Sequence, residues 1–329
     1  RRIGVPPDSC VLEFETQGAR SKLTPDVWAR GVAHAKTKGY SFCHWEISNE
    51  PYLMRPGTAF PTPDSYVKHV QAVSRAIRAV DPKAQIGIGI HKKSEKWGNY
   101  ILKQTAGSYD FVAAHHYSFV RSIQTCSFEA ATLAANYRAL DTCLKVNALL
   151  RAYNPGREVV QIDTEWGMHC GGPNGERADY VDRNANIVGT VHRAVRLIYY
   201  AREGMLAGAS AWQMLNRVGA QGFAVLGPTV PEQRFMLYWL YYYFNRHVGE
   251  WALDLEGTAP RYTPGEGDAS GFKEGGFTGP QTHILATLSK EGDALFLVIA
   301  NGSWSKAVPC RIEIRNFHVA QAEGILLSH

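Results

Sequence analysis

The stretch Trp45-Glu46-Ile47-Ser48-Asn49-Glu50-Pro51 decides the fold class, because a second stretch of the same kind, Asp163-Thr164-Glu165-Trp166-Gly167, follows later in the chain. Each is a short run with strand propensity that ends in a glutamate followed by a turn signal. In a barrel of parallel strands, the carboxyl ends of the strands gather at one mouth. Two glutamates that face each other there are the pair of carboxylates that glycoside hydrolysis needs.

Around these stretches the sequence alternates between strand and helix patterns, which indicates a parallel sheet with helical crossovers. Five strand–helix units begin near residues 41, 84, 110, 158 and 207, and before them 11–16 could supply at most one further strand. We predict helices at about 25–38, 64–80, 94–105, 128–153, 180–202 and 232–247. Short alternating runs at 283–288, 294–300 and 311–314 then predict a small antiparallel β domain. The predicted domains are a (β/α) barrel at 1–248 and a β-sandwich-like domain at 249–329.

Strand parity separates the polar side chains from the apolar ones. Glu46 shares a face with Glu50, and Asp163 shares one with Glu165, in each case opposite apolar residues. We expect the apolar faces to pack on the helices and the polar faces to line the inside of the barrel. Because a buried carboxylate is costly unless it is paired or functional, we interpret Glu46 and Asp163 as structural residues and the two strand-end glutamates as functional ones.

At these residues the chain resembles clan A of the glycoside hydrolases, the retaining enzymes with a (β/α)8 TIM-type barrel. Asn49-Glu50-Pro51 is similar to the clan's signature at the end of strand four, and Thr164-Glu165-Trp166-Gly167 to its nucleophile motif at the end of strand seven. His115-His116-Tyr117 and Ser210-Ala211-Trp212-Gln213 are similar to the motifs of strands six and eight. The C-terminal β appendage suits the branch that is similar to glycoside hydrolase family 39.

The resemblance implies a double displacement, with Glu165 as nucleophile and Glu50 as acid/base. It also implies that Asn49 binds the sugar 2-hydroxyl, that Tyr117 hydrogen-bonds the nucleophile and that Trp212 floors the subsite for the scissile sugar. By parity His115 lies on the face of Tyr117 and helps to hold Glu165 ionised. Asn49 and Glu50 have opposite parity, so both reach one sugar only if the strand breaks its alternation there.

Two further residues are candidates for the mouth of the barrel. His91, which follows the strand at 84–90, either points into the mouth or caps the barrel. Trp166 follows the nucleophile and either contacts sugar or belongs to a surface loop.

The pattern departs from the clan at its beginning, since strands one to three should precede Glu50 and only about forty residues do so. Three explanations stay open: a missing N-terminal segment, which we favour, a second chain that completes the barrel, or a circular rearrangement. An open half-barrel exposes strand edges, which is an aggregation hazard.

Composition excludes several classes of function. The chain has 329 residues, a net charge of +5 and no basic stripe with interleaved aromatics, so we expect no nucleic-acid partner. It has no apolar run of membrane-spanning length, so we expect no membrane span. The six cysteines form no CxxC motif, which argues against a zinc site; a Cys126–Cys143 disulfide is compatible with the spacing, and Cys43 reads as a core thiol.

We therefore expect a retaining β-glycosidase or endo-glycanase that acts on a plant or microbial oligo- or polysaccharide, without metal or cofactor. We expect it to be secreted or periplasmic rather than cytoplasmic. One alternative is a catalytically inactive, carbohydrate-binding barrel. A second is a metal-dependent hydrolase that uses His115, His116, His169 and Glu165, although adjacent strand residues point to opposite faces and do not readily bind one metal.

Overall fold

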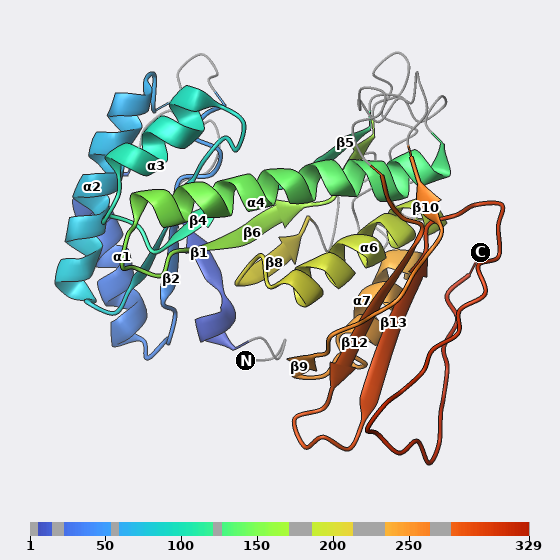
Figure 1. Ribbon diagram of the computed structural model, residues 1–329. Helices are drawn as coiled ribbons and strands as arrows, with labels where there is room; N and C mark the ends of the chain where they lie inside the picture. Colours follow the sequence, from blue (N-terminus) through green and yellow to red (C-terminus); the bar gives the residue numbers. More distant parts are fainter. Residues whose placement is uncertain are drawn as a thin grey trace. The chain divides into compact units, whose positions relative to one another are not determined.

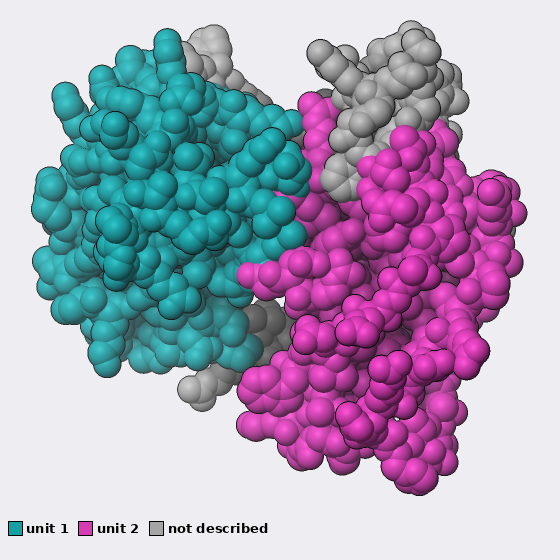
Figure 2. Space-filling view, in the orientation of Figure 1, with its two compact units in different colours: residues 1–116, 141–166, 205–210 teal, residues 117–140, 167–204, 211–329 magenta. Residues whose placement is uncertain are grey.

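The computed structural model describes residues 6–14, 23–53, 59–120, 127–170, 186–212, 234–263 and 278–328. The chain forms two compact units, which Figure 2 shows in different colours. Unit 1 comprises residues 1–116, 141–166 and 205–210, and unit 2 comprises residues 117–140, 167–204 and 211–329. Neither unit has a boundary at residue 248, so the division into a barrel at 1–248 and a β domain at 249–329 stays a prediction.

Six parallel strands form a curled half-barrel in the order β1-β2-β3-β4-β6-β8 (Figure 1). The strands are β1 (Val11–Glu13), β2 (His44–Ile47), β3 (Gln85–Gly89), β4 (Phe111–Ala113), β6 (Val160–Trp166) and β8 (Gly208–Ala211). All five predicted parallel strands are present, and the stretch 11–16 supplies a sixth, β1. The strands predicted at 41–48, 84–90, 111–117, 158–165 and 207–214 are all shorter in the structure.

The helices of this region also lie where the sequence predicts them. They are α1 (Pro25–Thr37), α2 (Pro63–Val80), the π-helical turn η2 (Glu95–Tyr100) with α3 (Ile101–Gln104), and the π-helical turn η3 (Ala130–Ala134) with α4 (Ala135–Tyr153). The Thr24 side chain accepts the Val27 N–H at the start of α1, and Thr62 forms a capping box with Ser65 at the start of α2. Proline in the first turn of each helix follows the same start signal.

The core of unit 1 lies between the outer face of the sheet and these helices. Trp45 and Ile47 of β2 and the isoleucines of β3 are buried there. Their partners come from α1, α2, α3 and the C-terminal part of α4: Trp28, Val32, Val70, Val73, Ile77, Ile101, Leu102, Val146 and Leu150. For β2 and β3 the predicted assignment of faces is therefore confirmed.

In β6 the predicted assignment of faces is wrong. Gln161 and Asp163 are buried without lining the inside of the half-barrel. The Gln161 amide donates to the Cys143 carbonyl and to Asn147 of α4, and Asp163 accepts the backbone N–H of His116. Hydrogen bonds to the covering helix and to a neighbouring strand end thus satisfy these polar groups, and the structural role expected for Asp163 is confirmed.

One buried tyrosine hydroxyl joins the ends of β2 and β3. Tyr66 of α2 donates to the Ile47 carbonyl at 2.6 Å and accepts the Gly89 N–H at 3.1 Å. A Cβ at Gly89 would lie 2.9 Å from Pro51 Cδ and 3.0 Å from the Ser48 carbonyl oxygen, so the chain that follows β2 packs directly on this glycine. The hydroxyl and the missing side chain together fix where β2 ends.

The described part of unit 2 contains small sheets and several helices. β12 (Thr282–Leu288) pairs antiparallel with β13 (Leu295–Asn301) along its whole length and with β9 (Trp251–Ala252) at one end. β10 (Arg261–Tyr262) pairs with β11 (Gly279–Pro280), and β5 (Ser118–Val120) pairs in parallel with β7 (Met168–Cys170). Its described helical residues are α6 (Ile187–Glu203), α7 (Met236–Phe244), η3 and the start of α4. In unit 1 the short 3-10 helix η1 (Pro7–Ser9) precedes β1.

Several predicted elements differ in detail. α6 begins at Ile187, where Asn186 caps its N-terminus, and it ends at Gly204, whose φ of 57° makes the left-handed turn. No strand forms at 311–314, because Ile312 and Ile314 are exposed and alternation alone gives a strand nothing to pair with. Cys43 is partly exposed and precedes β2, so its assignment to the core is wrong; Cys126 lies outside the described residues, and the disulfide with Cys143 stays a prediction.

None of the helices in the described ranges combines the length and the apolar character needed to cross a bilayer.

Replacing Tyr66 by Phe should lower the free energy of unfolding by about 1–3 kcal/mol, because the Ile47 carbonyl and the Gly89 N–H would be left buried without this partner. Urea titration followed by fluorescence measures the change. Tyr40→Phe is the matched control, since Tyr40 is 51% exposed, and we expect it to change stability by less than about 0.5 kcal/mol. Equal urea midpoints for Tyr66→Phe and the wild type would contradict a stabilising role for these two hydrogen bonds.

Candidate active site

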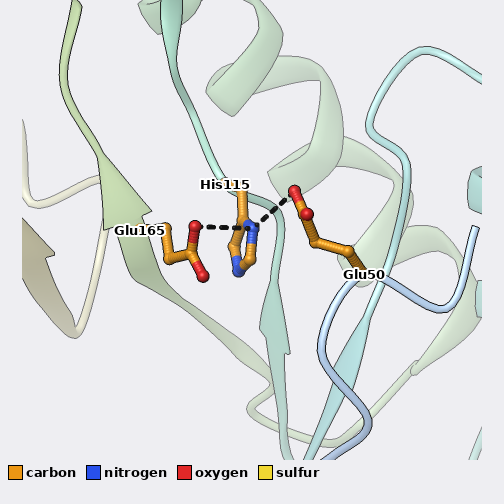
Figure 3. Close-up of side chains that lie close together, drawn as sticks. All are labelled: Glu50, His115 and Glu165. Carbon is orange, nitrogen blue, oxygen red and sulfur yellow. Dashed lines mark hydrogen bonds and ion pairs between the residues drawn. The ribbon is translucent and has the colours of Figure 1, made fainter. Parts of the chain in front are cut away.

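Three side chains from three strand ends meet in unit 1: Glu50 after β2, His115 after β4 and Glu165 in β6 (Figure 3). One ligand atom from each of them lies within 4.8 Å of the others. His115 Nδ1 is 3.1 Å from Glu50 Oε1 and 3.7 Å from Glu165 Oε2, so the ring stands between the two carboxylates. The structure thus brings Glu50 and Glu165 together, while their catalytic roles stay predictions.

The backbone turns these side chains toward one another. Four non-glycine residues of the described ranges have positive φ, and three of them, Ser48 (67°), Glu50 (45°) and His115 (41°), lie at these strand ends. Such conformations are costly for residues with a Cβ and persist where the surroundings enforce them. The positive φ angles of Ser48 and Glu50 break the strand alternation where the sequence predicts it, at Asn49–Glu50. The positive φ of His115 breaks the alternation after β4 in the same way.

Glu50 has two hydrogen-bonding partners on the same oxygen. The Tyr52 hydroxyl donates to Oε1 at 3.0 Å, and His115 Nδ1 lies 3.1 Å from it. Burial, the charge of Glu50 and this hydrogen bond raise the pKa of Tyr52, so its hydroxyl stays a donor over the whole working pH range. The hydrogen bonds of Tyr52 and His115 thereby fix the position of Glu50 Oε1.

The other ring nitrogen of His115 connects the pair to a deeper carboxyl group. Nε2 lies 3.2 Å from Thr164 Oγ1, and the Thr164 hydroxyl hydrogen-bonds Glu46. Burial opposes a charge on the ring, but the hydrogen bond to Glu50 and the carboxylates of Glu165, Glu46 and Glu50 outweigh it, so the pKa of His115 is raised. The ring thus carries a proton more readily than a free histidine does.

Glu46 and Glu13 form a second pair of carboxyl groups at this end of the sheet. They stand opposite each other in the β1–β2 register, and Glu46 is only 3% exposed. Burial and the mutual repulsion of the two groups raise the pKa of Glu13 to about 8, and burial above all raises that of Glu46 to about 7. Two such neighbours do not both ionise at neutral pH, so the pair holds a proton.

The predicted sugar-binding residues of unit 1 have different surroundings. His91 follows β3, and its ring packs edge-on against Tyr52, which itself contacts Glu50. The Asn49 backbone N–H donates to the Glu13 carboxyl group, while a contact of its side chain with sugar stays a prediction. Trp166 is the last residue of β6 and is 1% exposed, so the surface-loop interpretation is wrong and the ring presents no open face to a sugar in this structure.

The remaining two predicted residues belong to unit 2. Tyr117 directly precedes β5, and Trp212 is 38% exposed with its carbonyl accepting from buried Arg193. Their predicted contacts with the nucleophile and the sugar stay predictions.

Glu50, His115 and Glu165 are also the one group of metal-type donors found among the residues that the structure describes. We interpret the group as an acid–base site, because His115 Nδ1 hydrogen-bonds Glu50 directly and Nε2 lies against the Thr164 hydroxyl. The four-residue metal site does not form: the ring of His116 turns away to Gln161 at 2.8 Å, and the side chain of His169 lies outside the described residues.

Sequence reasoning missed the residues that surround the glutamate pair. Tyr52 stands two positions after Glu50, and Thr164 stands directly before Glu165, so proximity to the motifs was a usable signal. Glu13 had a weaker signal, as one of two glutamates, with Glu15, within the stretch 11–16. Lys92, which donates to the His115 carbonyl, had none, because only the fold brings the ends of β3 and β4 together.

Comparison with known proteins places the fold among glycoside hydrolases. The α-L-arabinofuranosidase of Thermotoga maritima superposes with a TM-score of 0.66 at 14% identity, over 87% of this chain and 60% of that one. The β-xylosidase of Caulobacter crescentus gives 0.54 at 16% identity, over 86% and 57%. The family 44 xyloglucanase of Paenibacillus polymyxa gives 0.55 at 14% identity, over 88% and 62%.

These likenesses show the fold alone, and this chain spans about 60% of the length of the enzymes that it matches. No protein-family model and no curated protein sequence matches it. The partial TIM-type barrel and the expected similarity to clan A in fold are consistent with the neighbours, while the narrower resemblance to family 39 stays a prediction.

Replacing Glu46 by Gln should flatten the pH dependence of stability. The folded protein retains a proton on Glu46 up to a pKa of about 7, whereas the unfolded chain releases it near the ordinary value of 4.5. The stability of the wild type should therefore fall as pH rises from 4.5 to 7, by on the order of 3 kcal/mol relative to the variant. Urea midpoints at pH 5 and pH 7.5 measure the difference.

Glu158→Gln provides the control, because Glu158 is exposed just before the same strand, β6, that carries Glu165. We expect it to follow the wild type at both pH values. The interpretation is wrong if Glu46→Gln does so too.

Proposed function

We propose that this protein is a retaining glycoside hydrolase in which Glu165 is the nucleophile and Glu50 the acid/base. In the first step Glu165 attacks the anomeric carbon while Glu50 gives a proton to the leaving oxygen. In the second step water attacks the glycosyl-enzyme, and Glu50 takes a proton from that water. The substrate is an oligo- or polysaccharide.

The observation that carries the proposal is the approach of Glu50 and Glu165, whose oxygens lie within 4.8 Å across His115. A retaining enzyme holds its carboxyl groups about 5–5.5 Å apart, and an inverting enzyme holds them about 6.5–9.5 Å apart to admit a water molecule. The distance therefore favours direct attack by a carboxylate over attack by water.

The fold supports the same proposal. Both glutamates follow or end parallel strands, at the carboxyl edge where barrel enzymes carry their chemistry. The superposed structures are described as an arabinofuranosidase, a xylosidase and a xyloglucanase, so their substrates suggest pentosides and glucan chains as the first sugars to test.

Replacing Glu165 by Ala should lower turnover by about 10³-fold or more, because no covalent intermediate can form. Sodium azide should restore turnover, with a glycosyl azide of the opposite anomeric configuration as product. NMR of the product identifies the anomer. Glu158→Ala is the matched control and should retain wild-type activity; full activity of Glu165→Ala would exclude Glu165 as nucleophile.

Replacing Glu50 by Ala should lower kcat/KM on natural glycosides by about 10²–10⁴-fold, the usual contribution of acid–base catalysis. Aryl glycosides with good leaving groups need no protonation, so their first step should be largely spared. Steady-state assays on both substrate types give the comparison. Equal losses on both would remove Glu50 from the acid role.

The most direct test is mass spectrometry of the intact protein after incubation with 2-deoxy-2-fluoro aryl glycosides of several sugars. One covalent adduct that maps to Glu165 would support the retaining mechanism and identify the sugar. Activity should also survive EDTA, whereas loss in EDTA would favour a metal-dependent hydrolase. No adduct and no turnover with any sugar would favour a carbohydrate-binding protein.

A further inference from the structure

Glu46 is connected to Glu50 by an unbroken series of hydrogen bonds. From Glu50 Oε1 the series passes to His115 Nδ1 at 3.1 Å, from Nε2 to Thr164 Oγ1 at 3.2 Å, and from the Thr164 hydroxyl to the Glu46 carboxyl group. Glu46 and His115 are 3% and 5% exposed. Since the proposed function gives Glu50 the role of acid/base, any group that exchanges protons with it matters to the reaction.

The series has a definite polarity, because a hydroxyl carries one proton and a neutral imidazole carries one proton. If Glu46 is ionised, Thr164 donates to it, His115 Nε2–H donates to Thr164, and Nδ1 is left to accept the proton of Glu50. If Glu46 is protonated, it donates to Thr164, Thr164 donates to Nε2, and Nδ1–H donates to the Glu50 carboxylate. The imidazolium with both carboxylates ionised is a third arrangement with the same number of protons.

We propose that Glu50 shares one proton with Glu46 through His115 and Thr164, which makes Glu46 a positioning residue that sets the protonation of Glu50. In the exchange, the Glu46 proton moves to Thr164 Oγ1, the Thr164 proton moves to Nε2, and the Nδ1 proton moves to Glu50. No proton enters or leaves, and no bond between heavy atoms changes. The inference rests on the proposed function only in giving Glu50 its catalytic role.

The surroundings of Glu46 allow it to hold this proton near neutral pH. Glu13 stands opposite it, and Glu13 Oε1 is buried without a hydrogen-bonding partner among the described residues. A second negative charge on this pair is therefore unfavourable, which agrees with the raised pKa of both groups. The other charged or titratable groups that face Glu46 or His115 are Glu50, Glu165 and Lys92, and His91 faces Glu50.

The test replaces Thr164 by Val, which keeps the shape and removes the hydroxyl, with Thr164→Ser as the control that retains it. Each arrangement of the shared proton uses this hydroxyl to connect Glu46 with His115, and when Glu46 is ionised the hydroxyl donates to it and lowers its pKa. The pH at which His115 and Glu50 lose the shared proton should therefore shift in Thr164→Val, because the proton can no longer pass between Glu46 and the ring. Thr164→Ser should match the wild type.

Two measurements report this midpoint. One is the pH titration of the ring nitrogens of His115 in protein labelled with ¹⁵N-histidine, assigned by comparison with His115→Gln. The other is the basic limb of the kcat/KM profile. A purely structural role for Thr164 would lower stability or kcat and leave both midpoints unchanged.

The outcomes separate the two proposals. A shifted NMR midpoint without glycosidase activity would support the shared proton and contradict the proposed function. Full activity with unchanged midpoints in Thr164→Val would overturn the shared proton and leave the proposed function standing. If Thr164→Val does not fold, Glu46→Gln replaces it. Loss of the Glu46 carboxyl group should lower the midpoints of His115 and of the kcat/KM profile. Midpoints equal to those of the wild type would overturn the inference.

Discussion

The hydroxyl of Tyr66 is the contact on which the geometry of the site depends. It lies in the core between α2 and the sheet, and it bonds the last carbonyl of β2 and the last N–H of β3. With the strand end fixed there, the next three residues turn the chain so that Glu50 faces the neighbouring strands. The buried Tyr66 side chain thus helps to position the Glu50 carboxyl group through the backbone.

The candidate site consists of carboxyl groups at two depths, joined by one histidine and one threonine. Burial disfavours charge on each of the deeper groups, and the hydrogen bonds and shared protons between them offset part of that cost. Removing one member would take a hydrogen-bonding or charge partner away from its neighbours. The arrangement is therefore a single electrostatic unit, in which the protonation of each group depends on its neighbours.

Sequence patterns were sufficient for the parallel strands and their covering helices, because strand ends, proline starts and glycine stops are local signals. They also drew attention to Glu50 and Glu165, which stand at the ends of predicted strands, and the resemblance to clan A added His115. Parity failed at Gln161 and Asp163, where long-range hydrogen bonds to α4 and to the end of β4 make burial of a polar face possible. Glu13 and Lys92 could not be assigned, because only the order of strands in the sheet makes them neighbours of the site.

Gly89 also helps to position Glu50, although it has no functional group of its own. The turn that carries Glu50 rests on its bare Cα, where even one methyl group would meet backbone and proline atoms at about 3 Å. A random mutagenesis screen for loss of activity would accordingly rank this glycine beside the glutamates, and a search for reactive side chains would pass over it. Inactivation of an enzyme by a substitution is thus evidence about shape as often as about reactivity.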